Sequence, residues 1–305
     1  MKKKSLLIKL NEDKYALLML APTVILLFLF TYLPIYGILL AFQDYKLGQN
    51  VLDFFNANWV GLKHFYDFVN SIFFTRIFWN TLRLSLLNLA YGFWVPILFA
   101  LLLNEIRHMW YKRITQTFVY LPYFISTVIV VAIMMNLTAQ QGPINRSIMA
   151  FGGQSISFMN SKQHFDMLYV VSNIWQSYGY SSIIYLAAIS GVDPTLYEAA
   201  IMDGANRFHR IVYITIPGIL PTVTILLLLA IGGIISANTD KILLMYNSST
   251  MAVADVIGTY VYRVGLANMR YSYTAAVGLF TNVINFVLIF SANMAARRFA
   301  GYSLW

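Results

Sequence analysis

Six long runs without Asp, Glu, Lys or Arg constrain this chain more than any other feature of its sequence. They cover residues 15–43, 84–104, 114–145, 167–192, 211–239 and 271–296. A helix of about 20 apolar residues is long enough to cross the hydrocarbon core of a bilayer. With their ends adjusted, the runs predict helices near residues 16–42, 79–103, 117–137, 167–189, 217–237 and 272–295. The sequence therefore predicts an all-α, polytopic membrane protein with six transmembrane helices.

The composition agrees with a membrane protein. Only 11% of the 305 residues are charged and 59% are hydrophobic, whereas about 25% of the residues of a soluble domain are charged. The chain has no cysteine, which excludes disulfides and cysteine-ligated metals. A net charge of +9 would suggest nucleic acid as the partner of a soluble protein. In a membrane protein the position of the charges matters more, and we expect no nucleic-acid partner.

Lys and Arg residues predict the orientation of the chain. With the N-terminus inside, the cytoplasmic segments hold twelve of these residues and the longer outer segments hold eight. Cytoplasmic loops are enriched in Lys and Arg, so we expect both termini to be cytoplasmic. The first apolar run is too long for a signal peptide, contains Pro22 and Pro34, and lacks a small-residue cleavage site. We therefore interpret it as an uncleaved first span.

The most distinctive polar stretch lies between the fourth and fifth spans. Asp193 can cap a helix whose first residue is Pro194, a position where a missing N–H costs nothing. Gly204 follows the helix-permissive run TLYEAAIMD, and a glycine there can adopt the left-handed conformation that ends many helices. A second short helix is predicted to start at Asn206 or Arg207. We expect a helix, a glycine corner and another helix on the cytoplasmic side.

The same stretch resembles the EAA loop of permease subunits of ABC importers. Glu198, Ala199 and Ala200 are followed by Gly204 and then by Ile-Thr-Ile-Pro at residues 214–217, with Ile216 where the family motif has leucine. The resemblance extends over nearly the full chain through LAPTVILLFLFTYLPIYG in the first span, NTL at 80–82 and YLPYFIS at 120–126. The chain is most similar to the oligosaccharide branch, the relatives of the maltose permease.

The resemblance implies a function and a set of partners. Residues 193–217 would carry the coupling helix, which docks on a separate ATPase through Glu198, Ala199, Ala200, Met202, Asp203, Gly204, Ala205, Arg207 and Phe208. The partners would be a second homologous permease, two ATPase subunits that bind ATP and Mg, and an external solute-binding protein that delivers a carbohydrate. The chain itself would need no cofactor. It would lie among lipids in a bacterial cytoplasmic membrane, with residues 1–15 and 296–305 cytoplasmic and residues 16–295 forming the permease domain.

No catalytic or P-loop motif is present, and the four histidines lack the spacing of metal ligands. Polar residues within spans usually face a bundle interior or a water-filled path. The cluster WQSYGY in the fourth span suits a sugar because it combines aromatic faces with amide and hydroxyl groups. The expected substrate path contains Asn88, Trp175, Gln176, Tyr178, Tyr180 and Asn285, although helix packing would also explain these residue types.

Other interpretations remain open at this point. An ion-coupled secondary carrier for a small polar solute would need an ionisable group in the membrane, and no carboxylate lies in the middle of a predicted span. A membrane-embedded enzyme would need clustered histidines or carboxylates, which the sequence also lacks. The aromatic outer segment 44–78 is typical of either an interfacial amphipathic helix or a docking surface for an external binding protein.

Overall fold

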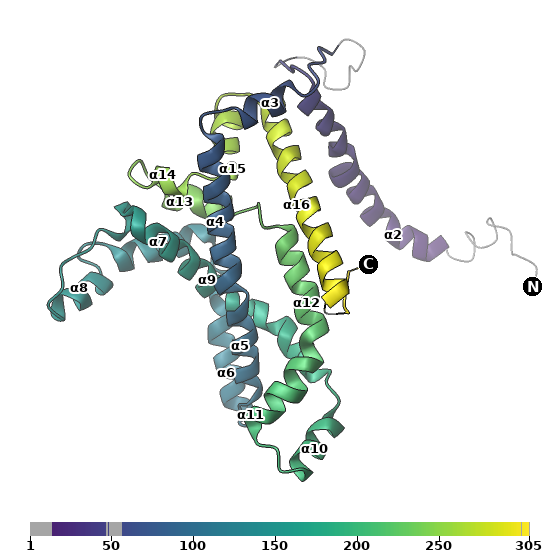
Figure 1. The fold of residues 1–305 in the computed structure, drawn as a ribbon, viewed down its shortest axis with the longest axis vertical. Coiled ribbons are helices and arrows are strands. Elements are labelled where there is room, and N and C mark those ends of the chain that lie inside the picture. Colours follow the sequence, from purple (N-terminus) through teal and green to yellow (C-terminus); the bar gives the residue numbers. More distant parts are fainter. Residues whose placement is uncertain (1–13, 47, 49–56, 300, 305) are drawn as a thin grey trace, which may run out of the picture. The chain divides into compact units, whose positions relative to one another are not determined.

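A computed structural model describes residues 14–46, 48, 57–299 and 301–304. The chain divides into two compact units, one of residues 1–70 and 264–280 and the other of residues 71–263 and 281–305. The described residues form helices and turns, and the β-structure among them is limited to a single bridge between Gln43 and Trp59. Figure 1 shows these elements along the chain.

The first unit begins with a long helical segment. It comprises α2 (Lys14–Leu27), the π-helix η1 (Phe28–Tyr32) and the 3-10 helix η2 (Leu33–Phe42), which begins beside Pro34. The short helix α3 (Lys63–Val69) follows, and Phe68 packs edge-on against Tyr273 and Phe280 of α16 (Tyr271–Phe299). α3 thus lies in the segment whose sequence suggested either an interfacial helix or a docking surface.

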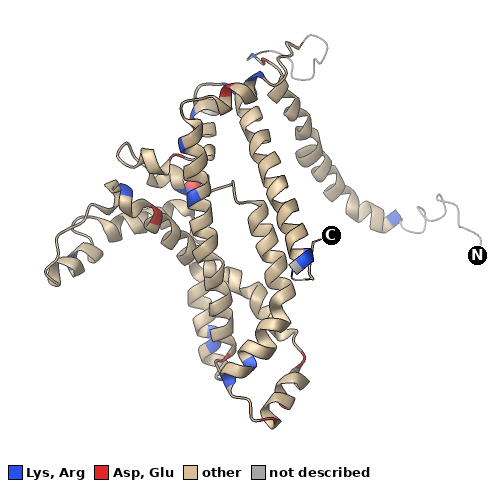
Figure 2. Ribbon diagram, viewed as in Figure 1, with Lys and Arg blue, Asp and Glu red and all other residues tan. Residues whose placement is uncertain are grey.

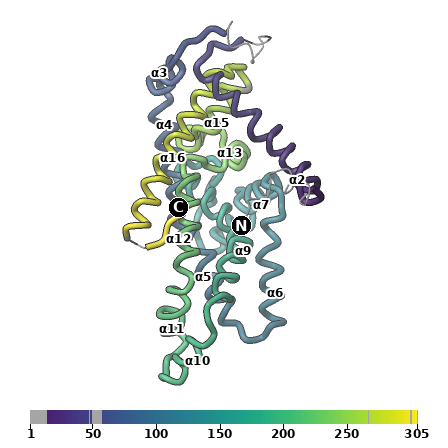
Figure 3. The backbone as a smooth tube through the Cα atoms, turned by 90° about the vertical axis from the view of Figure 1, so that its right-hand side faces the viewer, coloured from purple at the N-terminus to yellow at the C-terminus, as the bar shows by residue number. Residues whose placement is uncertain are grey.

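The second unit is built around α9 (Lys162–Ser190). α9 contacts α4 (Phe74–Gly92), α5 (Trp94–Asn104), α6 (Met109–Tyr120) and α12 (Ile216–Gly232). Gly179 permits the approach of α6, because a Cβ there would lie 2.2 Å from the carbonyl oxygen of Val119. The tube in Figure 3 follows α9 between α6 and α12.

Shorter elements complete the second unit at the two ends of these helices. The connection after α6 contains η3 (Leu121–Phe124), α7 (Thr127–Thr138), α8 (Pro143–Ala150) and η4 (Phe158–Asn160). The α9–α12 connection contains α10 (Pro194–Met202), α11 (Arg207–Arg210) and the π-helix η5 (Ile211–Thr215). The segment after α12 contains α13 (Thr239–Met245), α14 (Met251–Ala254), α15 (Ile257–Val261) and the π-helix η6 (Tyr262–Ala267), which runs into the first unit.

Five stretches among the described residues are long and apolar enough to cross a membrane: Lys14–Phe42, Phe74–Asn104, Thr127–Ala150, Arg207–Gly232 and Tyr271–Arg298. The fourth predicted span corresponds to α9, which has the length but a more polar composition. Two predicted spans differ in detail. In the third predicted span the α-helix is interrupted after Tyr120, at a segment that contains Pro122. In the fifth, the α-helix ends at Gly232, which is followed by Gly233, and not at the predicted residue 237.

Candidate functional site

The α10–α11 hairpin, residues 193–210, has the Asp193 cap that the sequence predicts and a second cap at Asn206. The carboxylate of Asp193 accepts a hydrogen bond from the backbone N–H of Thr195 at 2.9 Å, and Pro194 opens α10. Hydrogen bonds from the Thr195 backbone and hydroxyl lower the pKa of Asp193. At the second helix, the side-chain oxygen of Asn206 accepts from the N–H of His209 at 2.9 Å. Both short helices therefore begin at a capped residue.

Gly204 forms the corner between the two helices. Its φ of +78° lies in the left-handed region, which a residue with a Cβ rarely adopts. The N–H of Ala205 donates to the carbonyl of Ala200 at 2.8 Å, and the N–H of Gly204 donates to that of Ile201 at 3.0 Å. These two bonds form a Schellman motif, which pairs two of the carbonyls left free at the end of α10.

The hairpin presents an apolar surface to its surroundings. None of the residues of α10 or α11 is buried, and Met202 and Phe208 are 86% and 71% exposed. Of the other predicted coupling residues, Glu198, Ala199, Asp203, Gly204 and Arg207 are exposed, while Ala200 and Ala205 are half-buried. Charged residues of the second unit gather around this hairpin and again along α4 (Figure 2). An exposed cluster of large apolar side chains beside charges is typical of a protein-interaction site.

A polar pocket of about 500 Å³ lies within the second unit. Its walls come from α4, the η3–α7 junction, α9 and the end of α12 with the segment after it. The lining residues are Ser85, Asn88, Leu89, Tyr123, Thr127, Tyr169, Asn173, Gln176, Ser177, Ala230, Gly233, Ile234, Ser236, Ala237 and Asn238. None of them carries a charge, so the pocket offers hydroxyl, amide and aromatic groups instead.

Two interruptions of the helical backbone face this pocket. At the first, the side-chain amide of Gln176 donates to the carbonyl of Ile125 at 3.1 Å. At the second, the N–H of Ile235 donates to the side-chain oxygen of Asn285 at 3.1 Å, and the N–H of Asn238 donates to the hydroxyl of Tyr169 at 3.0 Å. Irregular backbone at membrane depth is tolerated where it is buried in protein or lines a water-filled cavity. The side chains of Gln176, Asn285 and Tyr169 supply the partners that a continuous helix would have supplied.

Three polar atoms at the pocket have no hydrogen-bond partner within the described part of the chain. They are the hydroxyl of Ser85, the side-chain oxygen of Asn88 and the side-chain nitrogen of Asn173. Buried polar groups are normally paired, and these atoms lie on the two facing helices α4 and α9. A ligand or water that both donates and accepts hydrogen bonds would satisfy them, and a sugar hydroxyl does both.

The predicted path residues lie in different places. Asn88 and Gln176 line the pocket, and Asn285 supports its wall. Trp175 lines a separate apolar cavity. Tyr178 packs edge-on against Phe99 with ring centroids 5.2 Å apart. Tyr180 stacks on Tyr123, a lining residue, at 3.9 Å between ring centroids.

Several lining residues were absent from the predicted path, and the sequence contained a signal for some of them. Pro122 is a sequence signal for the helix interruption that brings Tyr123 and Thr127 to the pocket. Gly232 and Gly233 are the corresponding signal for the interruption that brings Ser236 and Asn238 to the pocket. Ser85 and Tyr169 had no such signal, because their positions depend on how α4 and α9 pack.

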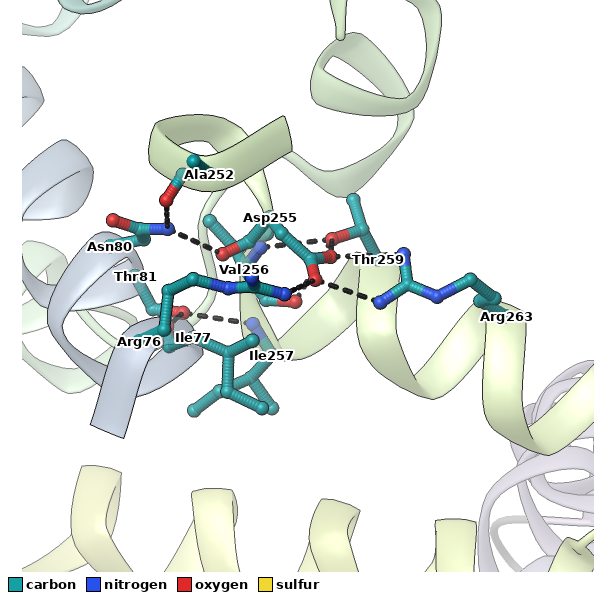
Figure 4. Close-up of polar contacts among 10 residues, drawn as sticks. All are labelled: Arg76, Ile77, Asn80, Thr81, Ala252, Asp255, Val256, Ile257, Thr259 and Arg263. Carbon is teal, nitrogen blue, oxygen red and sulfur yellow. Dashed lines mark hydrogen bonds and ion pairs between the residues drawn. The ribbon is translucent and has the colours of Figure 1, made fainter. Parts of the chain in front are cut away.

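A clamp of polar residues ties the segment after α13 to α4 (Figure 4). It consists of Arg76, Asn80, Thr81, Asp255, Thr259 and Arg263. Outside that view, Arg83 of α4 adds a hydrogen bond to the carbonyl of Val253 at 2.8 Å. The carboxylate of Asp255 has no exposed surface and forms ion pairs with Arg263 at 2.7 Å and Arg76 at 3.4 Å. Thr259 donates a further hydrogen bond to it at 2.8 Å. The hydrogen bonds to Asp255 raise the pKa of Arg263 above its ordinary value.

Uncharged groups of α4 complete the clamp. The amide nitrogen of Asn80 donates to the carbonyls of Ala252 and Asp255 at 3.1 and 3.0 Å, and the N–H of Ile257 donates to the hydroxyl of Thr81 at 2.9 Å. Because α4 also carries Ser85 and Asn88, the clamp fixes this segment to the helix that forms one wall of the pocket.

Comparison with known proteins gives one consistent result. Residues 92–301 match the family described as binding-protein-dependent transport system inner membrane component. The chain is 43% identical over 291 residues to Protein LplB of Bacillus subtilis (strain 168), covering 95% of this chain and 91% of that protein. It is 44% identical over 299 residues to the polygalacturonan/rhamnogalacturonan transport system permease protein YteP of the same organism, covering 98% and 92%.

A solved structure agrees with these relatives. The structure is the crystal structure of a bacterial alginate ABC transporter in complex with an alginate pentasaccharide-bound periplasmic protein. One of its chains matches this chain with a TM-score of 0.88 and 37% sequence identity. The match covers 98% of this chain and 99% of that one. The likeness therefore extends over nearly the whole of this chain.

Proposed function

Because the chain belongs to the family of inner-membrane components of binding-protein-dependent transport systems, we propose that it is the permease through which an oligosaccharide crosses the membrane. The main support for a sugar as the transported molecule is the lining of the pocket. Its amides, hydroxyls and two tyrosines match the hydroxyl rim and C–H faces of a sugar. The unpaired atoms of Ser85, Asn88 and Asn173 supply both donors and acceptors.

The relatives support a carbohydrate cargo. YteP is named for polygalacturonan and rhamnogalacturonan, AraP of Bacillus subtilis for arabinooligosaccharides, and the solved transporter for alginate. An oligosaccharide of this kind is therefore the cargo we propose. Among the described lining residues no side chain is charged, so a neutral sugar would be bound without burying an unpaired protein charge, and the pocket has no charged side chain that would select an acidic sugar.

ATP hydrolysis on separate subunits would drive the transport. We propose that the α10–α11 hairpin inserts its exposed apolar side chains, Met202 and Phe208 among them, into a cleft of an ATPase subunit. ATP and Mg would bind to that subunit and not to this chain. A second, related permease chain, a second ATPase and an external binding protein would complete the transporter.

This arrangement requires the hairpin to be cytoplasmic. The Lys and Arg distribution supports that orientation, with residues 1–15 and 296–305 also inside and residues 16–295 as the permease domain. A reporter enzyme fused after Trp305 should be active only in the cytoplasm, and activity on the outer side would refute the orientation.

The cargo is tested by uptake into vesicles that contain the complete transporter. Trigalacturonate and arabinotriose would be offered with the purified binding protein. The double variant Asn88→Leu, Asn173→Leu should lose uptake of the transported sugar while the complex still assembles, because apolar side chains cannot pair with hydroxyl groups. Leu98→Met, at an exposed apolar position of α5 outside the pocket, should transport normally. Undiminished uptake by the double variant would exclude this pocket from the path.

A further inference from the structure

A second cavity, here called the α4–α9 groove, lies on another face of these two helices. It measures about 450 Å³ and is lined by Leu87, Tyr91, Gln163, Asp166, Met167, Val170, Val171 and Ile174. Leu87 and Tyr91 are four residues apart on α4, and the α9 residues recur at intervals of three and four, so each set forms one stripe along its helix. The lining is apolar except at one end, where Gln163 and Asp166 lie.

An ion pair marks that polar end. Arg83 lies one turn before Leu87 on α4, and its guanidinium is 3.1 Å from the carboxylate of Asp166. The same guanidinium donates to the carbonyl of Val253 at 2.8 Å. Both side chains are partly exposed, at 39% and 27%.

The pair also lies near one end of two predicted spans, since Arg83 is within about one turn of the start of the predicted helix 79–103 and Asp166 directly precedes the predicted helix 167–189. Arg83 directly precedes the charge-free run 84–104, and Asp166 directly precedes the charge-free run 167–192. Charged side chains are costly within the hydrocarbon region and are accepted at its boundary. In a bilayer the ion pair would therefore lie at the depth of the lipid head groups, and the apolar length of the groove at the depth of the acyl chains.

Positive charge dominates beyond this boundary. Arg76 lies two turns before Arg83 on α4, and Lys162 lies one turn before Asp166 on α9 and is exposed. The carboxylate that pairs with Arg76 belongs to Asp255, which has no exposed surface. An approaching molecule therefore meets Arg76, Arg83 and Lys162, with Asp166 as the only accessible carboxylate among the charged groups of α4 and α9.

We propose that the α4–α9 groove binds one anionic phospholipid, with its phosphate near Lys162 and the arginines and an acyl chain along Leu87, Tyr91, Met167 and Ile174. Basic residues at the head-group level attract anionic lipids, and an apolar groove directly below them accepts a chain. The proposal depends on the membrane location of the chain and not on its carbohydrate cargo. In the proposed orientation the lipid belongs to the outer leaflet.

The occupied groove adjoins the machinery of transport. α4 and α9 carry the pocket residues Ser85, Asn88, Asn173 and Gln176 on other faces. A lipid chain between the two helices fills space on one side of them while the sugar passes on the other. The identity of the lipid therefore affects the packing of the helices that form the pocket.

The test measures lipid retained by the complete transporter in native mass spectra, after reconstitution in phosphatidylcholine nanodiscs with or without phosphatidylglycerol. Phosphatidylglycerol should be retained in preference to phosphatidylcholine. Lys162→Glu reverses a charge at the head-group end, and Met167→Trp fills the groove at a 59% exposed position. Lys162→Glu should lower retention about fivefold or more, equivalent to the ~1 kcal/mol that one basic residue contributes at an anionic surface. Met167→Trp should also lower retention, because the larger side chain occupies the space of the acyl chain.

Two matched controls keep the test specific. Arg113→Glu reverses an exposed charge on α6, and Leu102→Trp enlarges a 68% exposed apolar residue on α5. Neither lies at the groove, so both should retain lipid like the unmodified chain. Equal retention by all variants, or equal retention of the two lipids, would overturn the proposal. So would efficient cross-linking of a Met167→Cys variant to another polypeptide, because the groove would then be a protein interface.

Discussion

The side-chain nitrogen of Gln176 in α9 lies 3.1 Å from the carbonyl oxygen of Ile125, at the point where the third predicted span stops being helical. The hydrogen bond pairs a carbonyl that a continuous helix would have paired itself. Gln176 also lines the polar pocket. One amide therefore both supports the interruption and contributes to the surface that the interruption creates.

Gln176→Leu should abolish most uptake of the transported sugar. The substitution leaves the carbonyl of Ile125 without its partner, at a cost of about 1–3 kcal/mol, and removes a polar group from the pocket. Uptake into vesicles and the yield of assembled complex should be measured together. Trp175→Phe is the matched control, since Trp175 faces a different, apolar cavity. Normal uptake by Gln176→Leu would mean that the amide only packs there.

Gly204→Val should disrupt the hairpin, whereas Gly204→Asn should largely preserve it. A Cβ at Gly204 meets no atom within 4 Å, so the cost arises from the left-handed backbone and not from a clash. A left-handed conformation costs an ordinary residue roughly 1–2 kcal/mol, and Asn tolerates it better. The amount of ATPase that copurifies with each variant checks this. Equal recovery with Val and Asn would contradict it.

Asp255→Ala should destabilise the second unit more than any change at an exposed carboxylate. It leaves Arg76 and Arg263 without their shared partner and removes one of the two acceptors that the Thr259 hydroxyl reaches, the other being the carbonyl of Val256. Breaking a buried ion pair costs about 3–5 kcal/mol, and the partial exposure of both arginines reduces this to about 2–3 kcal/mol. The measurement is thermal unfolding in detergent, with Asp240→Ala at an exposed position as the control. Identical melting temperatures would show that the clamp contributes no stability.

Lys241→Met should stabilise the protein at neutral pH. Lys241 is fully buried, its amino group has no hydrogen-bond partner in the described residues, and burial lowers its pKa from 10.5 to about 8. Below pH 8 the folded protein holds an ammonium that the unfolded chain would solvate better, a penalty of about 3 kcal/mol. Between pH 8 and 10.5 only the unfolded chain binds the proton, so the penalty is relieved as the pH rises.

The pH dependence distinguishes this effect from simple improvement of packing. The melting temperature of Lys241→Met should exceed that of the unmodified protein at pH 7, and the difference should shrink by pH 10. A difference that is independent of pH would indicate that the methionine merely packs better and that the ammonium carries no penalty.

Local signals predicted the hairpin well. The Asp193 cap, the Gly204 corner and the start of the second helix at Arg207 all lie where the sequence places them, because each depends on residues within a few positions of one another. The apolar runs likewise predicted helices, and their charge-free lengths required no tertiary information.

The pocket could be predicted only in part. Asn88 and Gln176 line it, but Trp175 of the same WQSYGY cluster lies on an apolar cavity. A helix places neighbouring residues about 100° apart, so a polar cluster in sequence does not stay together in space. The clamp could not be predicted from the sequence either, because Arg76 and Asp255 are separated by 179 residues.

The proposed function depends on a contact between the α10–α11 hairpin and an ATPase subunit. Ala200 is half-buried in α10, and its carbonyl accepts the Schellman hydrogen bond from Ala205. A large charged side chain at this position would hold α10 away from a groove on the ATPase. The chain should still insert, since the change lies outside the membrane-spanning helices.

The most direct measurement is therefore the sugar-dependent ATPase activity of the complete transporter with Ala200→Arg, compared with His108→Arg, which adds an arginine at an exposed position outside the hairpin. We predict that Ala200→Arg loses sugar-stimulated hydrolysis, uptake and most of the copurifying ATPase, while the external binding protein still captures sugar and His108→Arg behaves like the unmodified protein. Fully stimulated, sugar-dependent hydrolysis by Ala200→Arg would contradict the assignment of the α10–α11 hairpin as the coupling contact.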